Sequence, residues 1–472
     1  MTSPLPEPTA RHLEKVRDFY EAAPTELRWG ARGYRKLLAH YYNLIVPAES
    51  SVLEVGCGSG ELLAQIKAAR KTGIDLSARQ IAAAQLRVPD ARFHVAAGEL
   101  AELNEQFDVI ILSDTLNRAA DVQLLLERLQ SSAHPGTRLI INFQNSLWRP
   151  LLSLARLLGL KSNEPENSWL APSDVINLLQ LAGWNPVCRQ ARLLLPIPIP
   201  LLSPLLNRWL APLVQWSCLT VFIVARPVRP AAQPRTVSVI IPARNEAGNI
   251  EAAVRRTAEL GAGTELIFVE GHSRDDTWAQ IQRVAQEYPD RKIKIMQQTG
   301  KGKGDAVRLG FAAATGDILM ILDADLTMPP EELPKFYEVI ANGRAEFANG
   351  VRLVYPMDEE AMQFLNLCAN KAFGIIFTWL LGQPVKDTLC GTKVLSRHHY
   401  ERIAANRAYF GDFDPFGDFD LLFGASKLNL KITELPVSYK ERKYGETKIS
   451  RFRHGLLLFR MAFIAFVKLK LH

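Results

Sequence analysis

Residues 316–333 read GDILMILDADLTMPPEEL, an apolar run that leads into Asp323-Ala324-Asp325 and then into a Pro-Pro-Glu-Glu helix start. Two carboxylates spaced i and i+2 at a strand end can share one hard divalent cation, Mg²⁺ or Mn²⁺, with diphosphate oxygens. Such a cation offsets the charge that grows on a leaving nucleoside diphosphate. An isolated pair of this kind is more often a helix cap with an incidental neighbour. At the end of a fourth strand in a strand–helix alternation, we predict that Asp323 and Asp325 are metal ligands and catalytic residues.

The segments before this stretch repeat the order of strand, loop and helix. VSVIIPARNEAGNI (237–250) is a buried strand with Pro242, Asn245 and Glu246 at its end, and ELIFVE closes the second strand on Glu270. A carboxylate there can accept hydrogen bonds from a nucleotide base or a ribose. The Gly/Lys loop 299–310 is not a Walker loop, but we expect Lys303 to neutralise pyrophosphate. These residues form the predicted nucleotide-sugar site.

Residues 237–450 resemble GT-A-fold glycosyltransferases of the large inverting family two, and within it the polyprenyl-phosphate (dolichyl-phosphate) sugar synthases. The matching segments are GKGDAVRLG, DADLTMP, NGVRLVYP (349–356), DTLCGTKVLSR (387–397) and ITELPVSYKERKYGETKIS (432–450). The resemblance implies that Arg352 and Lys393 contact donor phosphates, with Lys448 as a further candidate. Thr392 departs from the family pattern, which often has an aromatic residue after Cys-Gly.

The general base depends on the acceptor. FGDFDLLFGASKLNL (416–430) places Asp418 and Asp420 before a helix, where inverting enzymes of this family carry acidic residues. A sugar hydroxyl needs a base, and either aspartate is a candidate. A polyprenyl phosphate is already ionised at neutral pH and needs none. The same acids also fit a solvated loop.

The N-terminal half has its own glycine loop. Residues 52–63 read VLEVGCGSGELL, in which a strand ends in Gly56-x-Gly58-x-Gly60 and a helix is expected from about Glu61. Asp75 closes a second strand, where an acid can take both ribose hydroxyls of a bound nucleoside. The third glycine comes one residue too early for the dinucleotide pattern G-x-G-x-x-G.

The stretch E-V-G-C-G-S-G resembles motif I of class I S-adenosylmethionine-dependent methyltransferases, and the resemblance covers roughly residues 35–225. FDVIILSD (107–114) and HPGTRLIINF (134–143) are similar to the fourth and fifth strands of that fold. The resemblance implies that the cofactor site is lined by Glu54, Gly56, Gly58, Gly60 and Asp75, with Asp114 facing methyl transfer. The acid that usually meets the adenine falls near Ala97, and Glu99 is shifted from that place.

The fold class is therefore α/β, with a Rossmann-like methyltransferase fold followed by a GT-A fold. We expect residues 1–227 to form the methyltransferase domain, 228–236 a Pro-rich linker, and 237–472 the glycosyltransferase domain with a basic amphipathic tail. Residues 431–472 hold ten Lys/Arg against three acids, an excess equal to the whole net charge of +7. Such a tail favours phosphates or an anionic membrane surface, and no nucleic-acid motif accompanies it.

No stretch has the pattern of a clean membrane span. Residues 194–225 contain five prolines, and the apolar segments 364–382 and 455–471 are interrupted by polar or basic residues. The last two suit amphipathic helices in a bilayer interface, although ordinary domain packing explains them as well. The five cysteines form no CxxC pair and no secretory signal is visible. We expect a cytoplasmic protein, peripheral on the cytoplasmic face of the membrane.

These patterns predict a bifunctional enzyme. One half would transfer a sugar from a nucleotide-sugar donor to a lipid-phosphate or glycan acceptor, with Mg²⁺ or Mn²⁺, and the other would methylate a related substrate from S-adenosylmethionine. The alternative is a glycosyltransferase whose N-terminal domain only binds cofactor or assembles partners. A nucleotidyltransferase is a third class, but it would carry a basic glycine loop after its first strand, and PARNEAGN matches that poorly.

Overall fold

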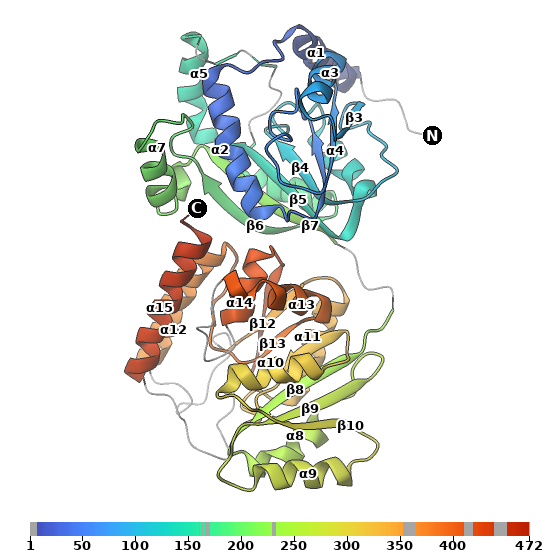
Figure 1. Cartoon of the computed structure of the whole chain (residues 1–472), viewed down its shortest axis with the longest axis vertical. Coiled ribbons are helices and arrows are strands. Elements are labelled where there is room, and N and C mark those ends of the chain that lie inside the picture. The colour runs from blue at the N-terminus through green and yellow to red at the C-terminus, as the bar shows by residue number, and fades with distance from the viewer. Residues whose placement is uncertain are drawn as a thin grey trace. The chain divides into compact units, whose positions relative to one another are not determined.

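The computed structural model divides the chain into two compact units, one that ends at Val228 and one that spans Arg229–Lys470, each built on its own sheet (Figure 1). It describes residues 7–159, 161–162, 164–165, 170–228, 233–352, 364–409, 419–438 and 451–471. Side chains are described throughout these ranges except at 8, 364–371 and 451–458. The units are called here the N-terminal and C-terminal units.

The N-terminal unit has a seven-stranded sheet in the order β3-β2-β1-β4-β5-β7-β6, parallel except for β7, which runs antiparallel between β5 and β6. Its elements are α1 (Glu7–Ala22), α2 (Trp29–Ile45), β1 (Ser51–Val55), β2 (Arg70–Asp75), α3 (Ala78–Arg87), β3 (Arg92–Val95), β4 (Phe107–Ser113), α4 (Val122–Arg128), η1 (Leu129–Ser132), β5 (Ala133–Gln144), η2 (Ser146–Trp148), α5 (Arg149–Leu157), α6 (Pro172–Leu181), β6 (Trp184–Arg192), α7 (Leu202–Pro204), η3 (Leu205–Leu210), η4 (Gln215–Ser217) and β7 (Thr220–Pro227).

Both faces of this sheet are covered. Along β4, Ile110 and Leu112 belong to one apolar core, while Val109 and Ile111 belong to the other. Successive side chains of a strand point to opposite faces, so an uninterrupted apolar run needs helices on both sides. Polar side chains therefore lie mainly at the ends of the strands, where the loops after β1, β2 and β4 lie near one another.

The expected helix after Gly60 is not formed. Residues 61–65 make turns only, closed by bonds such as Ala64 N to Gly60 O at 2.9 Å, and β2 already begins at Arg70. Of the 14 residues between Val55 and Arg70, five form the glycine loop and the last four, 66–69, are irregular, so only residues 61–65 are left to turn. The prediction was wrong here because the sequence shows the apolar residues of a helical turn but not the length available to it.

The C-terminal unit has a second seven-stranded sheet in the order β10-β9-β8-β11-β13-β12-β14, in which β13 runs antiparallel to both neighbours. Its elements are β8 (Val237–Ala243), η5 (Ala247–Asn249), α8 (Ile250–Arg256), β9 (Thr264–Glu270), α9 (Thr277–Glu287), β10 (Lys292–Gln297), α10 (Lys303–Ala313), β11 (Ile318–Ile321), η6 (Pro330–Glu332), α11 (Leu333–Ala341), β12 (Phe347–Val351), α12 (Phe364–Leu381), β13 (Lys393–Ser396), α13 (Arg397–Ala405), η7 (Arg407–Tyr409), α14 (Phe419–Lys427), β14 (Ile432–Pro436) and α15 (Arg451–Leu469).

Helices α12 and α15 lie side by side on this unit (Figure 1), joined by the stacked rings of Trp379 and Phe466, 5.7 Å apart. Across the described ranges, no helix combines the length and apolar character that crossing a bilayer requires. Ile375, Phe459 and Phe463 nevertheless remain exposed on these two helices.

Five non-glycine residues with positive φ follow strands directly or within a few residues: Asp114 after β4, Leu193 after β6, Asn245 after β8, His272 after β9 and Leu326 after β11. Left-handed backbone is unfavourable for side chains with a Cβ and persists only where the surroundings enforce it. These turns mark the carboxyl ends of both sheets as the places to look for binding sites.

Candidate functional sites

Asp75 ties the glycine loop of the N-terminal unit to the end of β2. Its carboxylate accepts from the amide of Gly58 at 2.8 Å and from the amide of Ser77 at 2.9 Å. Gly56, Gly58 and Gly60 all have positive φ, which explains why the loop needs glycines. Burial raises the pKa of Asp75 although both amide bonds act to lower it. The sequence-predicted loop and acid thus meet in one place.

Glu54 lies beneath this loop on β1. Its side chain is 2 % exposed, and its Oε2 atom has no hydrogen-bond partner. Burial raises its pKa to about 8, with Arg35 opposing and Asp75 reinforcing that shift. A buried carboxylate without a full set of partners is costly unless a cation or a proton compensates it. The position therefore fits a positively charged ligand.

Asp114 is held by residues that the sequence analysis did not connect with it. Its carboxylate accepts from Asn142 Nδ2 at 2.8 Å and from the Tyr34 hydroxyl at 3.3 Å, and Arg35 Nη1 lies 3.6 Å away. Arg35 also donates to Ser113 Oγ at 2.8 Å. Tyr34 and Arg35 come from α2, far from β4 in sequence, and no local pattern announces that contact. Glu99, considered for the adenine, instead accepts from the amide of Ala120 at 2.9 Å.

In the C-terminal unit, three motifs that are distant in sequence meet at the end of β11. Lys303 Nζ lies 2.5 Å from Asp323 Oδ1, and both side chains are partly exposed. Gly391 packs so closely that a Cβ there would overlap Asp323 Oδ2 and Lys303 Nζ. The Gly/Lys loop, the acid pair and the Cys-Gly segment therefore build one site.

Asp325 faces its own turn. Its Oδ1 accepts from the amide of Thr327 at 3.1 Å and from the Thr327 hydroxyl at 2.9 Å, while Leu326 between them has φ +53°. Within the described residues, no group of three or more His, Cys, Asp or Glu is placed to hold a metal ion. The two carboxylates fit a hard cation only if further oxygens, such as those of a diphosphate, complete its coordination.

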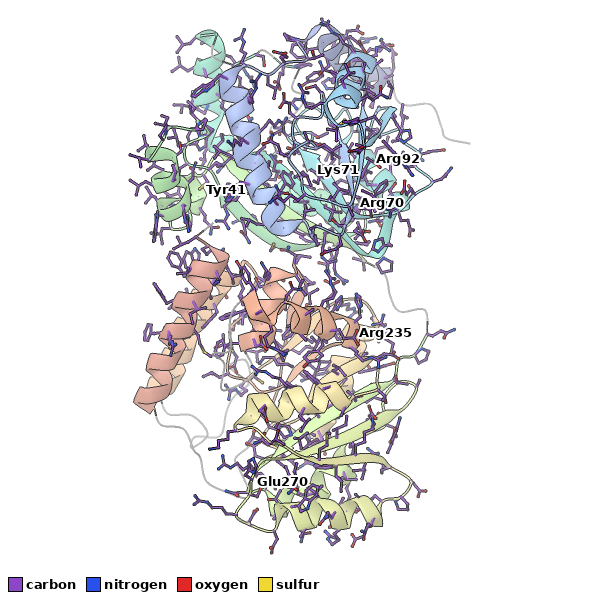
Figure 2. All side chains as sticks on the ribbon, in the orientation of Figure 1. Tyr41, Arg70, Lys71, Arg92, Arg235 and Glu270 are labelled. Atoms are coloured by element: carbon purple, nitrogen blue, oxygen red, sulfur yellow. The ribbon has the colours of Figure 1, made fainter. Side chains whose placement is uncertain are left out.

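The loops after β8 and β9 are bonded to one another. Asn245 donates its amide to Ser273 Oγ at 3.0 Å and accepts the amide of Arg274 at 2.8 Å, while the Glu246 amide donates to Thr277 Oγ1 at 2.9 Å. Glu270 closes β9 (Figure 2) and accepts from the amide of Ser273 at 2.5 Å. Burial raises the pKa of Glu270, but the bonds from Ser273 and Gln297 outweigh it and bring that pKa below its ordinary value.

Pro242 is the penultimate residue of β8, pairing in register with Val269 of β9. Pro242, Asn245, Glu246 and Glu270 therefore lie together at one end of these two strands, as a nucleotide site requires. Their contact with a nucleotide remains a prediction.

The two residues expected at donor phosphates are engaged inside the protein. Arg352 makes a two-pronged ion pair with Asp387, Nε to Oδ2 at 2.7 Å and Nη2 to Oδ1 at 2.8 Å. Burial would raise the pKa of Asp387, but Arg352 outweighs it and lowers that pKa. Lys393 is fully buried on β13 and donates to the carbonyl of Cys390. Their phosphate roles stay predictions, and Lys393 would have to change position to reach a ligand.

Asp420 is buried at the start of α14, where Arg407 Nε lies 2.7 Å from Oδ2 and Arg308 Nη2 lies 3.8 Å from the same oxygen. Both guanidinium groups hold the Asp420 carboxylate in ion pairs within the protein. That setting suits a positioning role better than a base. Asp418 and Lys448 lie outside the described residues.

Comparison with known proteins agrees with the division into two units. Residues 28–189 match the family model described as a methyltransferase domain, and residues 238–403 match glycosyl transferase family 2. A dolichol-phosphate mannosyltransferase of Pyrococcus furiosus is 33% identical over 223 residues, covering 45% of this chain and 59% of the relative. An undecaprenyl-phosphate 4-deoxy-4-formamido-L-arabinose transferase of Klebsiella pneumoniae is 26% identical, covering 46% and 64%.

Among solved structures, a methyltransferase of Thermotoga maritima described as S-adenosylmethionine-dependent is 17% identical with a TM-score of 0.34, covering 46% of this chain and 98% of that one. Both sequence relatives match this chain over less than two thirds of their own length. The chain contains a methyltransferase domain at residues 28–189 and a glycosyltransferase family 2 domain at residues 238–403 that resembles the dolichol- and undecaprenyl-phosphate sugar transferases.

Proposed function

We propose that the C-terminal unit transfers a sugar from a nucleotide-diphospho-sugar to a polyprenyl-phosphate acceptor, with inversion and with Mg²⁺ or Mn²⁺. The observation that carries this proposal is the meeting of Lys303, Asp323 and Gly391 at the end of β11. A lysine and two aspartates at one strand end form an arrangement that can hold a diphosphate through a shared cation and one ammonium. The names of the similar proteins support a polyprenyl-phosphate acceptor.

The chemistry follows from charge. When bound, the cation neutralises the charge that develops on the leaving nucleoside diphosphate. Asp323 and Asp325 would hold it, and Lys303 would move from Asp323 to a phosphate oxygen as the donor enters. The acceptor phosphate oxygen is already ionised and attacks the anomeric carbon from the side opposite the leaving group, so no side chain has to remove a proton. Asp420, paired with Arg407, would hold α14 against η7 beside the acceptor.

We further propose that the N-terminal unit binds S-adenosylmethionine at the Gly56–Gly60 loop and methylates a substrate related to the sugar product. When bound, this cofactor supplies an electrophilic methyl group on a positively charged sulfur. Asp75 would hold the ribose, and Glu54, buried with one oxygen unpaired, would face positive charge. Asp114, fixed by Tyr34 and Asn142, would orient the methyl acceptor.

The exposed Ile375, Phe459 and Phe463 on α12 and α15, with the exposed Arg460 beside them, support peripheral contact of the C-terminal unit with an anionic membrane. Free Cys57, Cys188, Cys218 and Cys390 agree with a cytoplasmic location.

The decisive test is release of nucleotide from a panel of nucleotide-sugars with Mg²⁺ or Mn²⁺, with and without polyprenyl phosphate. We expect turnover that requires both the cation and the lipid phosphate. Turnover that needs neither would overturn the proposal for the C-terminal unit. Labelled S-adenosylmethionine in the same mixture tests the N-terminal unit: binding without methyl incorporation into any lipid or sugar product would make it a cofactor-binding scaffold.

A further inference from the structure

The N-terminal unit exposes a large apolar surface that its fold does not use. Most of its exposed large apolar side chains in the described residues fall in two segments, 147–158 and 197–216. Helix α5 has no buried residue at all, and the stripe Leu147, Leu151, Leu154 and Leu158, at helical spacing, faces outward. A soluble helix normally turns such a stripe inward, so this one lacks its partner.

The second segment supplies tryptophans. Trp209 on η3 is 54% exposed and Trp216 on η4 is 73% exposed, with Leu205 and Leu213 also exposed between and beside them. Asn207 anchors η3 by accepting from the amide of Leu195 at 2.9 Å and donating to its carbonyl at 2.8 Å. The exposed rings therefore sit on a fixed support rather than on a free tail.

Hydrogen bonds bring the two segments together. Trp148 Nε1 donates to the carbonyl of Ser217 at 2.8 Å, and Asn145 Nδ2 donates to the carbonyl of Trp216 at 3.1 Å. Helix α2 and the residue before it contact both segments: Arg28, which precedes α2, donates to the carbonyl of Gly159 at 3.0 Å, and Gly33 within α2 lies so close to Pro198 that a Cβ would overlap it. Figure 1 shows α5 and α7 on the same side of α2. We call residues 147–158 and 197–216 the α5–η4 surface.

The charges on this surface have one sign. The charged residues of the α5–η4 surface are Arg149, Arg156 and Arg208, and its two segments contain no Asp or Glu. Exposed tryptophan and leucine beside arginine, without acids, match the interfacial region of an anionic bilayer: the rings sit at the headgroups and the guanidinium groups meet lipid phosphates.

We propose that the α5–η4 surface docks the methyltransferase unit on an anionic membrane, independently of α12 and α15. The same helix α2 that supports this surface carries Tyr34 and Arg35 to Asp114. Docking therefore brings the strand end at Asp114 close to the bilayer, and the methyl acceptor is a membrane lipid or a lipid-linked sugar. The identity of the acceptor rests on the proposed function, whereas docking itself does not.

The test compares full-length variants on phosphatidylglycerol-containing vesicles. In the background Phe459→Ser/Phe463→Ser, which removes exposed rings of α15, the set Leu151→Ser, Leu154→Ser, Trp209→Ser and Trp216→Ser should lower vesicle binding by about tenfold or more. The matched control Leu86→Ser/Leu100→Ser, exposed elsewhere on the same unit, should leave it unchanged. Brominated lipid should quench tryptophan fluorescence of the background protein and not of the four-residue variant.

Vesicle binding that is equal in the four-residue variant and the control would overturn the inference. So would a background protein that self-associates without lipid and loses that association in the variant, because the surface would then join copies of the chain. Nucleotide release with detergent-dispersed polyprenyl phosphate should be the same in all variants. Its absence from every protein, the unmodified chain included, would count against the proposed sugar transfer and not against docking.

Discussion

Lys303 Nζ and Asp323 Oδ1 lie 2.5 Å apart at the end of β11, so a lysine of the Gly/Lys loop pairs with the first acid of the proposed metal-binding pair. The Lys303 ammonium lies against the carboxylate that is proposed to bind the cation, and Asp323 lies against the ammonium that is proposed to bind the diphosphate. If the donor binds here as proposed, Lys303 and Asp323 separate, and the packing around the two side chains then affects turnover.

Gly391→Ala tests that packing. The added methyl group would overlap both Asp323 and Lys303, so we expect sugar-nucleotide turnover to fall about a hundredfold or more while the unfolding temperature changes little. Gly30→Ala, where a Cβ meets nothing within 4 Å, is the control. Unchanged turnover in Gly391→Ala would remove the Cys-Gly segment from the site.

Asp323→Asn and Asp325→Asn test the cation. Each removes one of two carboxylates, so Mn²⁺ binding in the presence of nucleoside diphosphate, followed by electron paramagnetic resonance, should weaken at least about tenfold. Chelation with EDTA should abolish turnover of the unmodified chain, and excess Mg²⁺ or Mn²⁺ should restore it. Asp290→Asn, exposed before β10, should behave as the unmodified protein. Full turnover in EDTA would exclude the proposed metal.

We predict that Glu54 makes the stability of the N-terminal unit depend on pH. Because its pKa is raised from 4.5 to about 8, the folded unit holds a proton that the unfolded chain has lost between these values. Its stability contribution is complete below about pH 4.5 and declines as the pH rises toward 8, by on the order of a few kcal/mol. Glu54→Gln should flatten this decline in denaturant titrations. If the slope persists in Glu54→Gln, another group is responsible.

The same group predicts proton release on cofactor binding. A positively charged ligand favours ionised Glu54 and lowers its pKa, so S-adenosylmethionine should release a proton at pH 7. Calorimetry in buffers of different ionisation enthalpy measures this release directly. The product, S-adenosylhomocysteine, whose sulfur carries no charge, should release fewer protons, and equal release by both ligands would argue against Glu54 as the group that meets the sulfur.

Asp75→Ala removes the acceptor of the Gly58 and Ser77 amides. We expect S-adenosylmethionine binding to weaken by at least about tenfold, with loss of order in the glycine loop. Sugar-nucleotide turnover by the C-terminal unit should be unaffected. Asp90→Asn, an exposed acid on the same unit, is the matched control, and equal affinity in the two variants would contradict the assigned site.

The parts of the sites that sequence predicts are those in which a short segment carries both the strand and its terminal residue. Asp75 and Asp323 follow apolar runs directly, and the family resemblance adds the expected ligands. The overall order of two α/β domains was confirmed because the alternation of apolar strands and helices recurs along both halves of the chain.

The remaining features depend on contacts between segments. Nothing in the sequence shows that Arg352 is held by Asp387, that Lys393 is buried, or that Asp420 lies between two arginines. Tyr34 reaches Asp114 across 80 positions, and no periodicity encodes such a distance. The failed helix after Gly60 has the opposite cause: a local preference for helix is overruled by the short path to β2.

The place of β7 has a consequence for synthesis and for fragments. This strand, Thr220–Pro227, is the last of its sheet in sequence but lies between β5 and β6. Until it leaves the ribosome, β5 and β6 have no partner along the sides that β7 will occupy, and both expose unpaired edges that invite aggregation. Fragments of the N-terminal half that end before residue 220 lack β7 and should therefore be insoluble. A fragment that ends after Pro227 is the shortest that contains all seven strands of the sheet.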